Sequence, residues 1–176
     1  MRDFLAIDFE TADQGADSAC AIGLVKVSGG VIVERRVQLI RPPRPYFMFT
    51  HIHGIQWSDC ASKPSFGQLW PTLRPMLSGA AFLAAHNASF DSRVLRACCQ
   101  SAGIDMPALP FLCTVALARK TWNLRPTKLS DCCTHLGIEL NHHEALSDAE
   151  ACAKIVLAAA REGAELPEKL RPKENA

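Results

Sequence analysis

Short apolar runs alternate with polar residues over the first forty positions of the 176-residue chain. Runs at residues 4–9, 21–27 and 31–40 have the length and the β-branched content of strands. The Ser-Gly-Gly sequence at residues 28–30 is typical of a tight hairpin turn. We therefore expect the chain to open with three strands, the last two joined as a hairpin.

The pattern changes after a proline-rich break at residues 41–45, because proline cannot donate a hydrogen bond to a sheet. A buried run at residues 80–85 predicts a further strand, reached by a parallel connection. Apolar residues at helical spacing predict helices, the first kinked or split near Pro71, over residues 65–77, 90–102, 115–122, 129–136 and 144–161. This order favours an α/β fold with a mixed sheet flanked by helices.

Length and composition indicate one domain, which we place at residues 1–162. Residues 163–176 are polar and interrupted by proline, so we expect a short, poorly ordered C-terminal tail. The formal net charge of +1 gives no global positive field, so any contact with nucleic acid must be local. No apolar run is long enough to span a bilayer, and the N-terminus lacks the apolar core of a secretory signal. We expect a cytoplasmic location and no contact with a membrane.

Eight cysteines could suggest disulfides or zinc. No C-x-x-C pair occurs, which argues against a zinc ribbon. We expect reduced thiols that serve as small core residues.

The first candidate chemistry is at the end of the first strand. Asp8 and Glu10 lie two apart, so both side chains leave one face of the strand while Phe9 enters the core. Two carboxylates this close repel each other unless a cation lies between them. The pair alone carries little weight, but ligands of α/β proteins tend to bind at such strand ends.

Two further carboxylates begin helices, and each has an ordinary structural alternative. Asp91 could simply complement a helix dipole, with Ser89 as N-cap. Asp148 could belong to a capping box that starts at Ser147, although the apolar pattern begins earlier. His143 would then lie in the preceding loop, free to act as a general base, whereas His142 is interpreted as a solvated side chain without a role.

Together these residues suit one reaction. Carboxylate oxygens favour Mg²⁺ or Mn²⁺, and two such ions can activate a water and stabilise a leaving 3′ oxygen during phosphodiester cleavage. A neutral histidine can remove the proton of the water.

The motifs DFET, HNASFD and H-x-A-x-x-D occur in this order at residues 8–11, 86–91 and 143–148. They resemble the histidine-containing branch of the DEDD exonuclease superfamily, typified by the proofreading epsilon subunit of bacterial DNA polymerase III, over residues 3–160. The segments at residues 51–55 and 129–138 are also similar. This resemblance implies a ribonuclease H-like fold and two divalent cations, with His143 as base and four metal ligands, namely Asp8, Glu10, Asp91 and Asp148.

The same resemblance implies substrate contacts. His53 would lie near the terminal nucleotide and Thr11 near its sugar and base. Phe49, with its aromatic neighbours Tyr46 and Phe47, could stack on bases or simply plug the loop onto the core. The chain departs from the family at Ala12-Asp13, where Thr-Gly is frequent, and at residues 127–129, where many relatives have an aromatic residue.

The expected function is 3′–5′ exonuclease action on single-stranded ends, with release of nucleoside 5′-monophosphates. DNA is favoured over RNA only by similarity, so an RNA or oligoribonucleotide exonuclease is the first alternative. A non-catalytic module that binds nucleic acid or a polymerase is a second, and a phosphatase of small esters is a third. About a dozen residues follow the last predicted helix, which disfavours a dedicated proofreading subunit and leaves a loose association with a DNA polymerase.

Overall fold

The computed structural model describes residues 1–167, and five strands in this part of the chain form one mixed sheet in the order β3-β2-β1-β4-β5. The strands are β1 (Phe4–Thr11), β2 (Ala19–Ser28), β3 (Val31–Leu39), β4 (Phe82–Ala85) and β5 (Phe111–Cys113). β1 and β3 both pair antiparallel with β2, whereas β1, β4 and β5 run parallel. The expected N-terminal strands, the hairpin and the parallel connection are confirmed.

Helices connect and cover these strands. They are α1 (Thr50–His53), α2 (Trp57–Cys60), α3 (Phe66–Leu73), the 3₁₀ helix η1 (Arg74–Leu77), α4 (Ser89–Ser101), α5 (Thr114–Trp122), α6 (Leu129–Leu136) and α7 (Ala145–Arg161). The predicted helix at residues 65–77 is split, as expected, but the change comes after Leu73 and not at Pro71. A capping box between Ser65 and Gln68 fixes the start of α3, and Pro71 is accommodated inside the helix.

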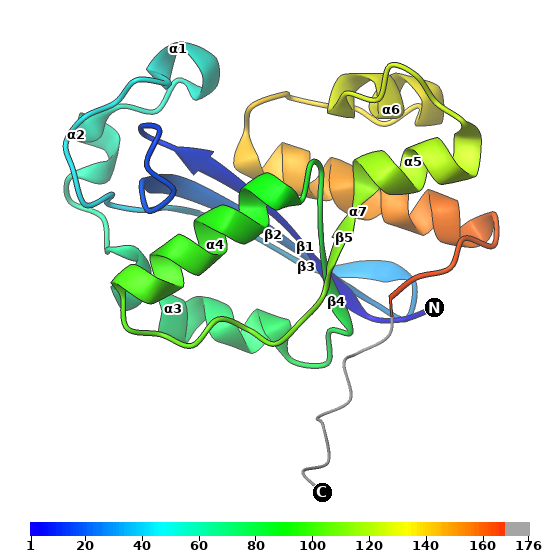
Figure 1. Ribbon diagram of the computed structural model, residues 1–176, viewed down its shortest axis with the longest axis horizontal. Helices are drawn as coiled ribbons and strands as arrows, with labels where there is room; N and C mark the ends of the chain where they lie inside the picture. Colours follow the sequence, from blue (N-terminus) through cyan, green and yellow to red (C-terminus); the bar gives the residue numbers. More distant parts are fainter. Residues whose placement is uncertain (168–176) are drawn as a thin grey trace, which may run out of the picture.

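The helices lie in two layers, with α3 and α4 on one face of the sheet and α5, α6 and α7 on the other (Figure 1). Each layer encloses an apolar cluster. Phe4 and Phe82 stack with ring centroids 5.0 Å apart on the α7 side, whereas Phe9, Phe66 and Trp70 form an aromatic group on the α3 side. This is the α/β arrangement that the sequence predicts.

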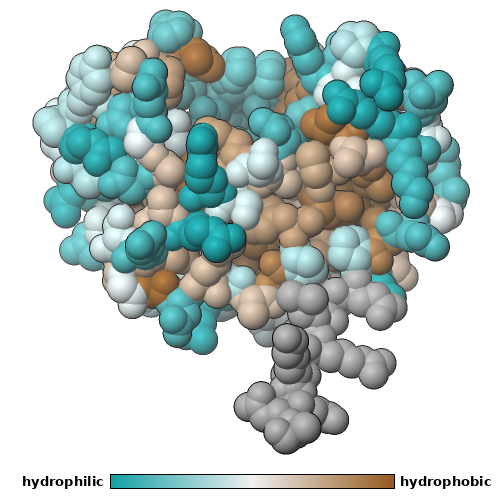
Figure 2. Space-filling model, in the orientation of Figure 1, coloured by the Kyte–Doolittle hydropathy of each residue, from teal (hydrophilic) through white to brown (hydrophobic). Residues whose placement is uncertain are grey.

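The state of the cysteines and the distribution of apolar side chains are those expected from the sequence. All eight cysteines are free thiols and seven are buried, as expected for small core residues. On the face shown in Figure 2, apolar side chains gather toward the centre and hydrophilic ones cover the periphery. Among residues 1–167 no helix has both the length and the apolar character needed to cross a bilayer. Residues 163–167 form no helix beyond a turn, and the rest of the predicted tail, residues 168–176, lies outside the described part.

Candidate active site

The candidate site forms where β1 extends beyond its neighbour. β4 pairs only with the first three residues of β1, so the later part of β1 is bordered by β2 alone. Phe9 in this part is 3% exposed and packs in the α3-side core, whereas Asp8 and Glu10 lie on the other face and are partly exposed. The alternation therefore places both carboxylates together, as predicted.

Asp91 of α4 fills the space that β4 leaves. Its Oδ1 accepts a hydrogen bond from the Phe9 amide at 3.0 Å, so the carboxylate takes the place of a strand partner. Asn87 turns the chain between β4 and α4 with a φ of 59°, a left-handed conformation that asparagine tolerates well. The expected cap at Ser89 is wrong, because Ala88 is the N-cap residue and the Ser89 hydroxyl donates to Asn87.

Asp148 comes from the first turns of α7. The helix begins at Ala145 without a side-chain cap, and Ser147 accepts a hydrogen bond from the Asn141 amide. The capping-box alternative for Asp148 is therefore wrong. Asp148 is 4% exposed and lies one turn inside the helix, beside the carboxylates of β1.

Gly23 of β2 makes this approach of α7 possible. It pairs with Asp8, and a Cβ at this position would overlap the Ala145 carbonyl and lie 2.7 Å from the Leu146 amide nitrogen. The first turn of α7 thus rests directly on the backbone of β2. Sequence reasoning missed Gly23, although a glycine inside a strand is a known signal of close backbone approach.

Two histidines precede α7. His143 has a φ of 68°, a left-handed conformation that is uncommon outside glycine, and its backbone amide donates to Asp148 Oδ2 at 3.2 Å. The exposed rings of His142 and His143 stack with centroids 3.8 Å apart. His142 Nδ1 also lies 3.0 Å from Asp148 Oδ2, so the interpretation of His142 as a merely solvated side chain is wrong.

The electrostatics of the cluster are unfavourable for four ionised carboxylates. Burial, reinforced by the charges of its carboxylate neighbours, raises the pKa of Asp8 well above its usual value. Burial and the charges of Asp148 and Asp91 raise the pKa of Glu10 to about 8. Burial raises the pKa of Asp91 to about 7 despite the Phe9 hydrogen bond, and burial also raises the pKa of Asp148. The fold therefore holds these carboxylates together at an electrostatic cost that a bound cation would offset.

The donor set fits hard cations. Carboxylate oxygens of Asp8, Glu10 and Asp148 all lie within 4.8 Å of one another, and Asp91 is close enough to raise the pKa of Asp8 by its charge. Asp148 Oδ1 is buried and has no hydrogen-bond partner among the described residues. A buried, unpartnered carboxylate oxygen is costly unless a cation binds it. These residues are therefore suited to hold Mg²⁺ or Mn²⁺.

His53 and Thr11 form the wall beside Glu10. The His53 Nδ1 accepts from the Ile55 amide at 3.0 Å, so Nε2 carries the proton and donates to the Thr11 carbonyl at 3.1 Å. Burial lowers the pKa of His53, and the charge of His143 lowers it further. Phe49 is half-buried at the N-cap of α1. The candidate substrate residues thus lie at the same strand end as the carboxylates.

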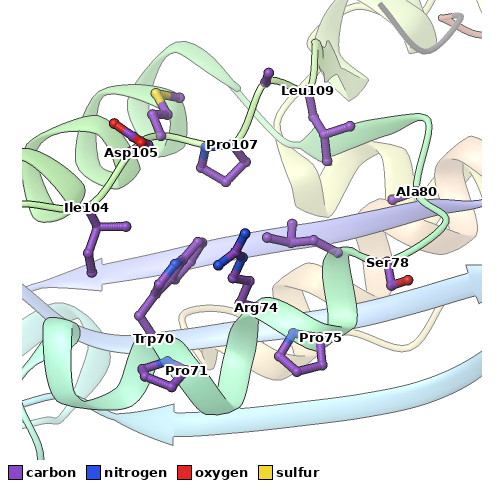
Figure 3. Close-up of a pocket in the computed structure, with 13 residues that line it drawn as sticks. Trp70, Pro71, Arg74, Pro75, Ser78, Ala80, Ile104, Asp105, Pro107 and Leu109 are labelled. Carbon is purple, nitrogen blue, oxygen red and sulfur yellow. The ribbon is translucent and has the colours of Figure 1, made fainter.

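A cavity also lies away from the carboxylates. It measures about 920 Å³ between α3 and the loop before β5, and none of the candidate residues lines it. Trp70 and Arg74 on one wall face Ile104, Pro107 and Leu109 on the other (Figure 3). The carboxylate site instead lies where the tip of β1 points between α1 and the start of α7 (Figure 1).

Comparisons with known proteins agree with this geometry. A family model described as Exonuclease, RNase T, matches residues 5–156. The chain is 35% identical over 159 residues to the PolC-type DNA polymerase III of Thermotoga maritima. The matched segment covers 88% of this chain and 12% of that protein. It is 33% identical over 144 residues to exodeoxyribonuclease 10 of Escherichia coli K12, covering 77% of this chain and 59% of that protein. The chain spans less than two thirds of either relative.

Solved structures show the same fold. Exonuclease X in complex with 5′ overhanging duplex DNA superposes with a TM-score of 0.75 at 26% identity, covering 94% of this chain and 96% of that one. The nuclease domain of 3′hExo, a DEDDh family member bound to rAMP, has a TM-score of 0.81 at 18% identity and 97% coverage of both chains. The ribonuclease H-like fold is therefore confirmed.

These matches indicate a nuclease, a hydrolase from a family that depends on divalent metal ions. The family model spans nearly all the elements that build the site, from β1 into α7. This chain belongs to the exonuclease (RNase T) family of the DEDD type.

Proposed function

We propose that the chain is a 3′–5′ exonuclease of the histidine-containing DEDD branch, which removes nucleoside 5′-monophosphates from single-stranded DNA ends. Two observations on one cluster carry this proposal. Carboxylate oxygens of Asp8, Glu10 and Asp148 lie within 4.8 Å of one another, and Asp148 Oδ1 is buried without a hydrogen-bond partner among the described residues. The metal ligands would be these three residues and Asp91, with Asp8 central among them because the charges of the other three all raise its pKa.

When two Mg²⁺ or Mn²⁺ ions are bound, they lower the pKa of an attacking water and stabilise the leaving 3′ oxygen. The residues of the chain orient this chemistry. Asp91 and Asp148 approach from helices on opposite faces of the sheet, and Asp8 and Glu10 approach from the strand between them. These four ligands are therefore held rigidly, because they belong to regular elements and not to loops.

His143 is the proposed general base. Its backbone amide is tied to Asp148, and its ring, stacked on that of His142, has a nitrogen within 4.8 Å of an Asp148 carboxylate oxygen. A neutral imidazole at this point can accept the proton of the attacking water. His142 is a neighbour of the same carboxylate, but the H-x-A-x-x-D spacing assigns the base to His143.

The substrate end would enter between His53, Thr11 and Phe49 on one side and His143 on the other. His53 is neutral and fixed by two backbone partners, so it offers a firm surface to a terminal nucleotide. DNA is favoured over RNA by the similarity to a polymerase exonuclease region and to an exodeoxyribonuclease. A cytoplasmic location and a loose association with a DNA polymerase belong to the same proposal.

The test is digestion of matched 5′-labelled DNA and RNA oligomers with Mg²⁺, with Mn²⁺ or with chelator. We expect a ladder shortened from the 3′ end, faster cleavage of DNA and no cleavage with chelator. The variant Asp8→Ala should lose at least a thousandfold in kcat, since it removes a ligand of the cation site. The matched control is Asp105→Ala, an exposed carboxylate in the loop before β5 that lines the cavity away from the site.

Full activity in Asp8→Ala would refute the catalytic assignment. Faster cleavage of RNA would establish the oligoribonucleotide alternative at the same site. Oligomer binding without turnover would show a non-catalytic binding module, and preference for a small chromogenic ester over any oligomer would show a phosphatase.

A further inference from the structure

An arginine outside the carboxylate site ties two loops together at its rim. The Arg44 guanidinium binds Asp13 through Nε at 3.0 Å and Nη2 at 3.1 Å, and binds Asp17 through Nη1 at 3.0 Å and Nη2 at 2.7 Å. All three nitrogens are used, in two side-by-side pairs of hydrogen bonds. We call this group of three residues the Arg44 clamp. It joins the turn after β1 to the segment after β3.

The clamp requires a residue without a side chain at position 15. A Cβ on Gly15 would overlap the Arg44 guanidinium and lie 2.8 Å from Asp17 Oδ1 and 2.9 Å from Asp13 Oδ1. The guanidinium therefore lies directly over the backbone of the turn, where no side chain fits. Asp13 also stands where glycine is frequent in the family that the motifs resemble, so the clamp lies outside the shared catalytic motifs.

The residues just after the clamp are held on both sides. The Met48 amide donates to the Ala12 carbonyl at 2.7 Å, two residues beyond Glu10. Phe47 packs against Ala12 and meets Trp57 edge-on, with centroids 6.5 Å apart. Phe47 thus plugs the loop onto the core, which is the second of the two alternatives that the sequence left open.

Tyr46 lies between these anchors and is nevertheless 62% exposed. It is the only tyrosine of the chain. Pro45 before it has a fixed φ and Phe47 after it is packed, so the backbone that carries the ring is held on both sides. Because Met48, two residues further on, pairs with Ala12 just beyond Glu10, an exposed aromatic ring at this point is suited to stack on a base of a bound strand.

We propose that the Arg44 clamp positions Tyr46 as a stacking surface for a nucleobase upstream of the scissile phosphodiester. This contact raises the affinity for single-stranded oligonucleotides and has no effect on the affinity for mononucleotide esters, which lack that base. This inference rests on the proposed exonuclease function. Arg44 is a positioning residue, because it acts through Tyr46 and touches no reacting atom.

The experiment compares two substrates, the oligonucleotide dT10 and the p-nitrophenyl ester of thymidine 5′-monophosphate, which has no upstream base. Tyr46→Ala, Arg44→Ala and Gly15→Ala should each raise KM for dT10 about tenfold and change kcat less than about twofold. The kcat/KM for the ester should stay unchanged. Tyr46→Trp should retain the low KM, because it keeps a stacking ring.

The double variant Arg44→Ala/Tyr46→Ala should raise KM no further than Tyr46→Ala alone, because the clamp acts through that ring. Arg41→Ala is the matched control, since the Arg41 side chain makes no hydrogen bond or ion pair within residues 1–167 and should leave both substrates unaffected. Thermal unfolding of each variant checks that it is folded.

Equal loss on dT10 and on the ester would overturn the proposal, since the clamp would then hold the whole site. Unchanged KM in Arg44→Ala or additive effects in the double variant would overturn it too. If the wild type cuts neither substrate, the exonuclease proposal fails separately. Anisotropy of labelled dT10 with Ca²⁺ then still decides whether Tyr46 and Arg44 contribute to binding.

Discussion

Replacing Gly23 with alanine tests whether close contact between α7 and β2 builds the site. The new methyl carbon would overlap the Ala145 carbonyl and lie 2.7 Å from the Leu146 amide nitrogen, whereas ordinary contacts begin near 3.4 Å. The first turn of α7 must therefore retreat by about 0.7 Å or more, a distance obtained from these two values. Asp148, on the same turn, must move with it.

The expected effects follow from this displacement. Overpacking typically costs about 1–3 kcal/mol, which lowers Tm by roughly 2–12 °C in a domain of this size. A shift approaching 1 Å in a catalytic group can cost about a hundredfold, so we expect kcat/KM to fall roughly tenfold to a hundredfold and Mn²⁺ to bind more weakly. Calorimetric melting, Mn²⁺ titration and dT10 digestion measure the three quantities.

Gly67→Ala is the matched control for this variant. A methyl group there would meet Ala102 at 3.1 Å, also a tight contact, but between α3 and α4 on the opposite face of the sheet. It should leave metal binding and cleavage unchanged. If folded Gly23→Ala kept wild-type Mn²⁺ affinity and kcat/KM, the dependence of Asp148 on this contact would be refuted.

Three further outcomes are expected. In chelator the free energy of unfolding should fall as pH rises from about 5 to 8, because the pKa values of Asp91 (about 7) and Glu10 (about 8) exceed their unfolded values and the folded state binds more protons. Bound Mn²⁺ should remove this pH dependence. Equal pH dependence with chelator and with Mn²⁺, measured by urea unfolding, would contradict the cation site. His143→Ala should lower kcat for dT10 by about 10²–10⁴ while His142→Ala costs less than about tenfold, and the reverse ranking in single-turnover assays would move the base to His142. Glu150→Gln removes partly exposed ion pairs with Arg35 and Lys154, so the free energy of unfolding in urea should fall by less than about 2 kcal/mol, and a larger loss would show a role in fixing α7.

Most of the strands and helices could be predicted from the sequence, because the periodicity of apolar residues within each segment is sufficient to identify them. Strand alternation places Phe9 in the core and Asp8 with Glu10 on the other face, and that assignment needs no knowledge of the partners. Helical spacing likewise predicted α7, including the place of Asp148 one turn inside it. Both features depend on neighbours within a few residues.

Other features depend on contacts between distant segments. The role of Asp91 as a substitute strand partner follows from β4 ending before β1 does, which no local pattern reveals. The importance of Gly23 depends on which helix turn rests on it, and the contact of His142 with Asp148 depends on a left-handed backbone at His143. The Arg44 clamp joins residues 27 to 31 positions apart. Periodicity gives the elements, but their mutual approach decides these contacts.

This dependence has an energetic consequence for the site. Four carboxylates are brought together against repulsion and loss of hydration, so the two apolar layers must hold them in place when no cation is bound. A cation that binds the folded cluster and not the unfolded chain then adds to the free energy of unfolding through mass action. Metal binding, the position of α7 on Gly23 and the ionisation of Glu10 are therefore linked, and a change in any one of them should alter the other two.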